Sequence, residues 1–355
     1  MNISKLTSII LSAGLAMTFV GCGNKQEAVI VTPESTPTSH SIIESTTPSG
    51  TYFSEMTGLP ISTELQEQRP IAVMVDCEQV ALPSYGLAEA DVVYDLRNSM
   101  INDYVTRFMA LYKDYNSVPQ IGSIRSTRPT NVWLAGEWNA IICHDGTDPE
   151  ADELIQHDFA QQHLSGCFSR LSNGKATEFT EYILSGDVDS AISSYGLDKN
   201  YNQYKLDGNH FNFVKYNTSL NVSSFKDANS ITLPFSHNGT TLAYNTETKS
   251  YDLSMYGEIH KDAEDDKILT FTNVLLISCD YHEITIHNIQ YHIVDNGGDG
   301  YYITNGKAEP ITWKKGGENE ITHYYDASGN DLQMNRGKTY INLVPSDTWN
   351  ELSIQ

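Results

Sequence analysis

The sequence predicts an α+β or α/β protein, with an N-terminal α/β sheet domain and flanking helices followed by a mostly antiparallel β domain. The first observation is a set of continuous apolar runs, separated by helix-like segments, between residues 51 and 216. The second is the change in residues 217–355 to short alternating segments bounded by turn signals. The chain of 355 residues is long enough for two modest domains of this kind.

The N-terminus carries a processing signal. Lys5 supplies a positive charge, residues 9–20 form an apolar stretch, and Gly21-Cys22 stands where a small-residue cleavage site belongs. The apolar stretch is too short to span a bilayer. The pattern resembles a bacterial lipoprotein signal. That resemblance implies cleavage before Cys22 and a diacylglycerol, with palmitate as its acyl chain, on the Cys22 thiol.

Residues 1–21 are therefore expected to be the signal peptide, and residues 22–50 the lipidated cysteine with a tether rich in Ser, Thr and Pro. The expected location is the cell membrane, where the protein is lipid-anchored on the extracytoplasmic face. The net charge of −23 argues against nucleic acid as a partner, because an acidic surface repels phosphate backbones.

The apolar runs of the first domain predict four strands, IAVMVD (71–76), DVVYDL (91–96), TRFMALY (106–112) and NAIICHD (139–145). Such runs are typical of strands that are buried on both faces of a helix-covered sheet. Pro129 predicts a helix that is capped near Ser126 or Thr127, and Pro149 predicts a second helix. A third helix is expected over residues 187–195.

The second half reads as alternating strands joined by tight turns. Asp-Gly at 299–300, Asn-Gly at 305–306 and Gly-Asn at 329–330 are hairpin signals. They favour antiparallel pairing throughout residues 217–355.

A cluster of arginines marks the candidate binding site. The chain has seven arginines, and Arg97, Arg107, Arg125 and Arg128 lie within 32 residues. A helix that begins near Pro129 presents unpaired N–H groups, which bind phosphate, sulfate or carboxylate. The candidate anion-binding residues are Arg107, Ser123, Arg125, Ser126, Thr127 and Arg128.

The alternative is that these arginines pair with acids at the strand ends, namely Asp76, Asp91 or Asp95, and brace the sheet. We expect bracing at Arg107, which lies within a strand, and ligand contact at Arg128, which opens the helix.

A second cluster combines acids and histidine at predicted strand ends: Asp76, Asp95, His144 and Asp145. If these side chains converge, they could hold a divalent metal for hydrolysis of a phosphodiester or glycan. If they separate into ion pairs, that hypothesis fails. Asp145 to Asp148 also has the composition of a turn and helix cap before Pro149.

Three further patterns, of histidines, cysteines and tyrosines, have more than one interpretation. His282, His287 and His292 are five apart, so His287 faces away from the others in a strand and surface histidines are favoured. Cys77 and Cys143 follow strands and could form a disulfide, with free buried thiols as the favoured alternative. The tyrosines at 201 and 204 fit either a carbohydrate groove or packing. No cofactor and no dedicated metal motif is expected.

Motifs along the chain resemble the YerB-type family of bacterial lipoproteins. The matching segments are Thr57-Gly58-Leu59-Pro60, Arg69-Pro70-Ile71-Ala72-Val73-Met74, Ala90-Asp91-Val92-Val93-Tyr94, Thr106-Arg107-Phe108-Met109-Ala110-Leu111-Tyr112, Arg125-Ser126-Thr127-Arg128-Pro129, Asn305-Gly306-Lys307 and Gly337-Lys338-Thr339-Tyr340-Ile341. The resemblance covers roughly residues 55 to 347 and implies a lipid-anchored, two-part protein without an assigned activity. The segments 95–105 and 176–182 depart from the family pattern.

We therefore expect a membrane-anchored extracytoplasmic lipoprotein that acts as a binding or scaffold module. Its expected partners are the membrane, through the lipid anchor, and an anionic envelope ligand or a protein. An enzyme is the less favoured class, and its form would be a metal-assisted hydrolase acting on an envelope phosphodiester or glycan.

Overall fold

The protein is described by a computed structural model that covers residues 47–355, and these residues belong to one compact unit. The signal peptide expected at 1–21, Cys22 and most of the tether expected at 22–50 lie outside the described residues. Within residues 47–355, none of the helices has the length and apolar character needed to cross a membrane.

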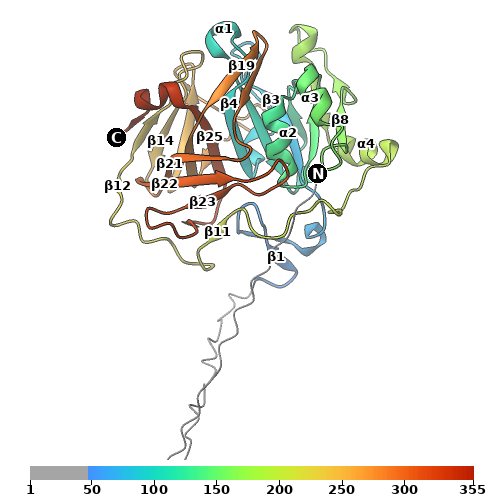
Figure 1. Ribbon diagram of the computed structural model, residues 1–355. Helices are drawn as coiled ribbons and strands as arrows, with labels where there is room; N and C mark the ends of the chain where they lie inside the picture. The colour runs from blue at the N-terminus through green and yellow to red at the C-terminus, as the bar shows by residue number, and fades with distance from the viewer. Residues whose placement is uncertain (1–46) are drawn as a thin grey trace, which may run out of the picture. The chain divides into compact units, whose positions relative to one another are not determined.

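One mixed sheet of eleven strands runs through the unit, and both halves of the chain contribute to it (Figure 1). Across the sheet the strands are β12 (Lys226–Asp227), β22 (Lys307–Lys315), β21 (Asn296–Thr304), β18 (Asn273–Cys279), β25 (Thr339–Pro345), β4 (Val92–Arg97), β5 (Thr106–Tyr112), β3 (Ile71–Asp76), β7 (Ile141–His144) and β8 (His163–Ser165), with β23 (His323–Tyr325) paired to β22. The boundary expected after residue 216 does not separate two sheets, because β25 pairs in parallel with both β18 and β4.

A second sheet of six strands packs against one face of the first. Its strands are β16 (Glu258–Ile259), β15 (Ser250–Met255), β14 (Thr241–Asn245), β13 (Ser230–Thr232) and β26 (Ser353–Ile354), with β17 (Thr270–Phe271) paired to β15. Val73 of β3 shares a core cluster with Leu253 of this sheet, whereas Met74 shares another with Leu134 of the helical layer. Both faces of the central strands are therefore buried.

This double burial differs from the predicted helix-covered sheet, because a second sheet covers one of the faces. The strand β5 pairs antiparallel with both β3 and β4, and only short helical turns connect these three strands along the chain. Their continuous apolar runs arise because a sheet and a helical layer cover the two faces, and not because the strands are parallel. Parallel pairing does occur between β3 and β7 and between β7 and β8.

The helical layer consists of α2 (Pro129–Gly136) and α3 (Pro149–Leu154). The helix α4 (Asp187–Tyr195) comes later in the chain, and its Val188 and Ile192 belong to the other core cluster, the one that contains Val73. Pro129 occupies the first position of α2 as predicted, but the cap is Arg128 rather than Ser126 or Thr127. Asp148 caps α3, and its Oδ1 accepts a hydrogen bond of 2.8 Å from the Ala151 N–H.

The turn signals of the second half are confirmed in part. Asn305 and Gly306 have positive φ and form the turn between β21 and β22. Gly300, in contrast, lies inside β21, where an added Cβ would sit 2.6 Å from the carbonyl oxygen of Leu276. Glycine is needed there for close approach to β18, so the Asp-Gly signal is not a turn. The parallel β18–β25 pair also limits antiparallel pairing in this half.

Short elements complete the unit. The remaining strands are β1 (Thr51–Phe53), β2 (Pro60–Ser62), β6 (Gln120–Gly122), β9 (Ser169–Arg170), β10 (Glu181–Leu184), β11 (Asn212–Phe213), β19 (Tyr281–Thr285), β20 (Asn288–Tyr291) and β24 (Gln333–Met334). The short helical turns are η1 (Thr63–Leu65), η2 (Leu87–Glu89), α1 (Ile101–Tyr104), η3 (Tyr115–Ser117), η4 (Thr177–Phe179) and η5 (Ser346–Glu351).

Candidate functional site

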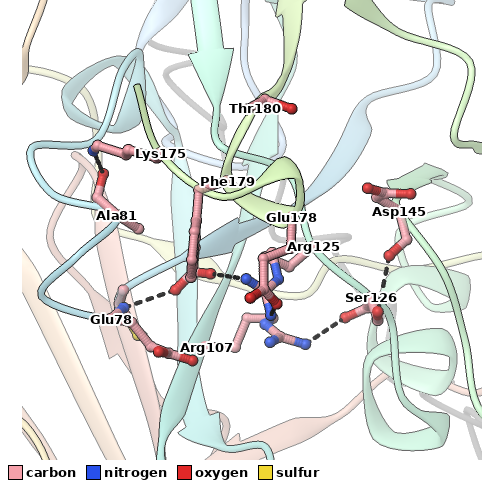
Figure 2. A network of polar contacts seen from close by, with 12 residues as sticks. Glu78, Ala81, Arg107, Arg125, Ser126, Asp145, Lys175, Glu178, Phe179 and Thr180 are labelled. Carbon is pink, nitrogen blue, oxygen red and sulfur yellow. Dashed lines mark hydrogen bonds and ion pairs between the residues drawn. The ribbon is translucent and has the colours of Figure 1, made fainter. Parts of the chain in front are cut away.

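The guanidinium of Arg125 lies between two carboxylates at the end of β3 (Figure 2). The Arg125 N–H donates to the Met74 carbonyl at 2.9 Å, so the backbone of the loop is fixed along β3. Its Nη1 lies 2.8 Å from Oδ2 of Asp76, and its Nη2 lies 2.9 Å from Oε2 of Glu178. This arrangement fixes the direction in which the guanidinium points.

The two ion pairs of Arg125 differ in exposure. The Asp76 side chain is 2% exposed and that of Arg125 is 15% exposed, whereas that of Glu178 is 58% exposed. The ring of Phe179 lies under the guanidinium, 4.8 Å from the ring centre. Arg125 is therefore anchored from inside by Asp76, and its outer side faces a carboxylate in solvent.

Arg107 lies beneath this pair. It is the register partner of Asp76 across β3 and β5, and its Nη1 donates to the Ser126 carbonyl at 2.9 Å. Its Nε is buried and has no partner within residues 47–355. Burial lowers the pKa of Arg107 to about 10, and the nearby Asp76 opposes this shift.

Arg128 has partners that the sequence did not indicate. Its Nε and Nη2 donate to the His287 carbonyl at 3.0 and 2.9 Å, and its Nη1 donates to the Thr127 carbonyl at 2.8 Å. Its Nε also lies 3.2 Å from Oδ2 of Asp148. Burial lowers the pKa of Arg128. The donors of Arg128 are thus engaged by protein groups, and the ligand contact expected at this residue stays a prediction.

Hydroxyl groups of the same loop lack partners. Ser123 Oγ and Thr127 Oγ1 are buried without a hydrogen bond among the described residues, as is Arg107 Nε. Ser126 Oγ, in contrast, donates to the Asp145 carbonyl at 2.8 Å. Buried polar groups are nearly always satisfied, so each of these three groups is a point at which water or a ligand would complete the structure.

Asp95, expected in the polar cluster, is separate from the others. It is fully buried in the sheet, and its Oδ2 accepts a hydrogen bond of 2.6 Å from the Tyr340 hydroxyl. Burial raises the pKa of Asp95 to about 7, although the hydrogen bonds from Tyr340 and Thr106 lower it. Asp95 is therefore an isolated core carboxyl.

His144 and Asp145 are also engaged elsewhere. His144 Nδ1 donates to the Gly146 carbonyl at 2.8 Å, and His144 Nε2 lies 2.9 Å from His163 Nδ1. Burial lowers the pKa of His144 to about 4, so its ring is neutral near pH 7. Asp145 forms an ion pair of 2.6 Å with Arg170.

The proposed metal cluster therefore does not form. Across residues 47–355, no group of three or more His, Cys, Asp or Glu side chains has the geometry to hold a metal ion. Each of the four residues forms ion pairs or hydrogen bonds with other partners. This is the separated arrangement under which the metal-site hypothesis fails.

Glu181 is a charged residue of this region that the sequence analysis did not single out. It is buried on β10, and its Oε2 lies 3.1 Å from Arg170, while its Oε1 accepts from the Phe168 N–H at 3.0 Å. Burial and the neighbouring Asp145 raise the pKa of Glu181 to about 7. The signal in the sequence was the pair of acids, Glu178 and Glu181, in the segment 176–182.

The histidine and cysteine patterns have simple outcomes. His282 and His292 lie together at the surface, with 2.7 Å between Nδ1 and Nε2, while His287 contributes its carbonyl to Arg128. Cys77 and Cys143 are free buried thiols, as favoured.

Tyr201 lines a cavity of about 220 Å³ together with aromatic and polar side chains that include Tyr52, Trp138 and His210. Its ring already contacts two ammonium groups, those of Lys113 at 4.4 Å and Lys205 at 4.0 Å from the ring centre. Its hydroxyl bonds to Glu55. These contacts favour packing over a sugar platform.

The chain matches a protein family that has an N-terminal and a C-terminal domain. Residues 56–198 match the family described as "Protein of unknown function (DUF3048) N-terminal domain", and residues 231–341 match the C-terminal domain of the same family. The chain belongs to this family, as the resemblance in the sequence implied.

A relative and a solved structure agree with this assignment. The chain is 26% identical over 298 residues to a protein of Bacillus subtilis (strain 168) that bears the provisional name of lipoprotein YerB, and the match covers 82% of this chain and 85% of the relative. The crystal structure of the YerB protein from Bacillus subtilis matches with a TM-score of 0.72 and 22% identity, covering 86% of this chain and 99% of that chain. This structural likeness shows the fold.

Proposed function

We propose that the protein is a lipid-anchored module on the extracytoplasmic face of the cell membrane, and that Arg125 holds an anionic group of an envelope component. The observation that carries the proposal is the unequal exposure of the two carboxylates bound to Arg125. Asp76 holds the guanidinium in place from inside, and the solvent-exposed Glu178 occupies the position that the ligand would take.

Replacing Glu178 by a ligand at this position costs little free energy. An ion pair with one exposed partner contributes about 0–1 kcal/mol, so an incoming phosphate or carboxylate can replace Glu178 without destabilising the fold. The guanidinium is already oriented by Asp76, which reduces the entropy lost on binding. The unpartnered Arg107 Nε and the Ser123 and Thr127 hydroxyls support the proposal, because they offer further donors near the loop.

The test is a thermal melt with increasing phosphate, followed by calorimetric titration. Glu178→Gln removes the competing carboxylate and should tighten phosphate binding by about 3- to 10-fold, while Arg125→Gln should abolish it. Glu89→Gln is the matched control, since Glu89 is an exposed acid paired with Lys267 at 2.5 Å. Phosphate binding that Arg125→Gln leaves unchanged would contradict the proposal.

The lipid anchor is tested separately. Replacing Cys22 with Ser removes the thiol that accepts the diacylglycerol, so the protein should move from the membrane to the soluble fraction. A variant that stays in the membrane fraction would show that the anchor lies elsewhere.

A further inference from the structure

Arg97 is a buried cation without a counter-ion. It ends β4, is 5% exposed, and takes part in no ion pair within residues 47–355. Its Nη2 donates to the Pro234 carbonyl at 3.3 Å, and its Nε is buried with no partner. Buried charges are normally paired, so a guanidinium in this state points to a missing anion.

Two tyrosine rings hold the guanidinium in position. Its Cζ lies 4.6 Å from the ring centre of Tyr104 and 6.0 Å from that of Tyr281. The hydroxyl of Tyr104 donates to Glu283 at 2.6 Å, and that of Tyr281 donates to Asp347 at 3.1 Å. The rings therefore form fixed walls, and their faces partly compensate the charge.

The guanidinium opens into a cavity of about 470 Å³. The apolar segment Leu233–Phe235 lines it beside Arg97 and the two tyrosines. Three acids also line it, Asp103, Asp347 and Glu351. The cavity thus combines one buried positive charge with carboxylates at its wall, and its size suits a small ligand.

The loop that carries Tyr104 has an unusual backbone. Asn102, Asp103 and Tyr104 have φ of 53°, 60° and 64°, a conformation that non-glycine residues rarely adopt. His237 Nδ1 donates to the Asn102 carbonyl at 2.6 Å and holds the loop to the neighbouring segment. The arrangement places Tyr104 over Arg97 and Asp103 on the cavity wall.

We propose that this cavity binds a small zwitterion, with its carboxylate or phosphate on Arg97 and its ammonium group on the acids of the wall. The buried guanidinium requires an anionic group, and bidentate contact would satisfy its free donors. A simple anion is repelled by Asp103, Asp347 and Glu351, and a simple cation leaves the buried guanidinium of Arg97 without an anionic partner. A ligand with both charges meets both requirements.

The chemistry allows two sources, an amino acid and a phosphate ester of an amino alcohol. Calorimetric titration of the full chain with alanine and with phosphoethanolamine distinguishes them, and acetate and methylammonium serve as single-charge probes. The titration is made in phosphate-free buffer, and Arg125→Gln is included because the Arg125 site is expected to bind anions independently.

Arg97→Gln should weaken binding of the preferred zwitterion by about 10-fold or more, since it removes a charge-assisted contact. Asp103→Asn, at an exposed wall position, should weaken it by about 2- to 5-fold. Arg336→Gln is the matched control. Arg336 also stacks on an aromatic ring, 4.2 Å from the centre of Phe53, but its Nε and Nη1 donate to backbone carbonyls.

The proposal is overturned if neither zwitterion binds at concentrations up to about 10 mM. It is also overturned if acetate binds as tightly as alanine, or if folded Arg97→Gln binds like the wild type. Should Arg97→Gln fail to fold, Asp103→Asn decides, because unchanged zwitterion affinity in that variant contradicts the role of the wall. Binding lost only in Arg125→Gln would assign the ligand to the other site.

Discussion

The two ends of α2 each hold a charge whose sign opposes the helix dipole, and they compensate it differently. Arg128, a cation, caps the N-terminus, and Glu137, an anion, follows the last residue at the C-terminus. Because backbone dipoles favour the reverse signs, each charge needs a partner. Asp148 supplies it for Arg128, and Lys315 supplies it for Glu137.

At the C-terminal end the carboxylate of Glu137 has several partners. Neither Glu137 nor Lys315 has an exposed side chain, and their charged groups lie 3.2 Å apart. The Glu137 carboxylate also accepts from the Thr322 N–H at 2.7 Å and hydroxyl at 2.8 Å, and from the Tyr94 hydroxyl at 3.3 Å. This end is closed around its buried ion pair.

At the N-terminal end donors remain free. Thr127 Oγ1 and Asn131 Nδ2 are buried without partners among the described residues, as is Arg107 Nε on β5. The side chains of Arg128 and Asp148 are 10% and 11% exposed. The difference between the two ends of α2 indicates where a ligand would bind, because a binding site needs polar groups that have no partner within the fold.

The largest effect is expected at the closed end. Glu137→Ala leaves the Lys315 ammonium buried with its carboxylate removed, at a cost of about 3–5 kcal/mol in the free energy of unfolding. Chemical denaturation measures this loss. The double variant Glu137→Leu with Lys315→Met should recover a large part of it, and a single variant as stable as the wild type would remove the contrast between the two ends.

The stability of the protein should depend on pH through Asp95, a buried carboxyl without a cationic partner. The folded-state pKa of Asp95 is raised to about 7 by burial, so its contribution to stability is complete below its ordinary pKa of 3.8 and is lost as pH rises toward about 7. Asp95→Asn should therefore be more stable than the wild type at pH 8, by roughly 1–3 kcal/mol, and equal or less stable at pH 4. Urea melts at the two pH values check the sign.

A smaller effect is expected at the open end. Arg128→Ala removes the partner of Asp148, whose Oδ2 is buried. That carboxylate keeps its hydrogen bond from the Ala151 N–H, and its side chain is 11% exposed, so a loss of about 1–2 kcal/mol is expected. The phosphate-dependent rise in melting temperature should persist in this variant, since Arg125 carries the proposed site. If Arg128→Ala abolished the rise while folding normally, the ligand contact would lie at Arg128 after all.

Local patterns predicted the elements well where one segment decides the structure. The run IAVMVD gave β3 its bounds, and Pro149 with Asp148 located the start of α3. The helix α4 has the predicted ends, with Gly196 in the left-handed conformation closing it. In each case the responsible residues are adjacent in sequence.

Partners distant in sequence were not predictable in the same way. Arg128 binds the carbonyl of His287, 159 positions away, and no local pattern marks a backbone acceptor. The pairing of Arg125 with Asp76 was anticipated as one of several options, because both follow strands, but Glu178 was not. The separation of Asp95 from His144 follows from strand order, which the apolar runs alone do not specify.

The place of β25 has a consequence for how this chain acquires its structure. This strand lies late in the sequence, at Thr339–Pro345, yet it joins β18 to β4 in the middle of the large sheet. The first half of the sheet cannot connect with the second until these residues are available, so the native contacts span most of the chain and folding should be slow. Slow folding of this kind would leave the chain extended for longer after its synthesis. Such a delay would suit the proposed extracytoplasmic location, which requires the chain to be exported before it folds.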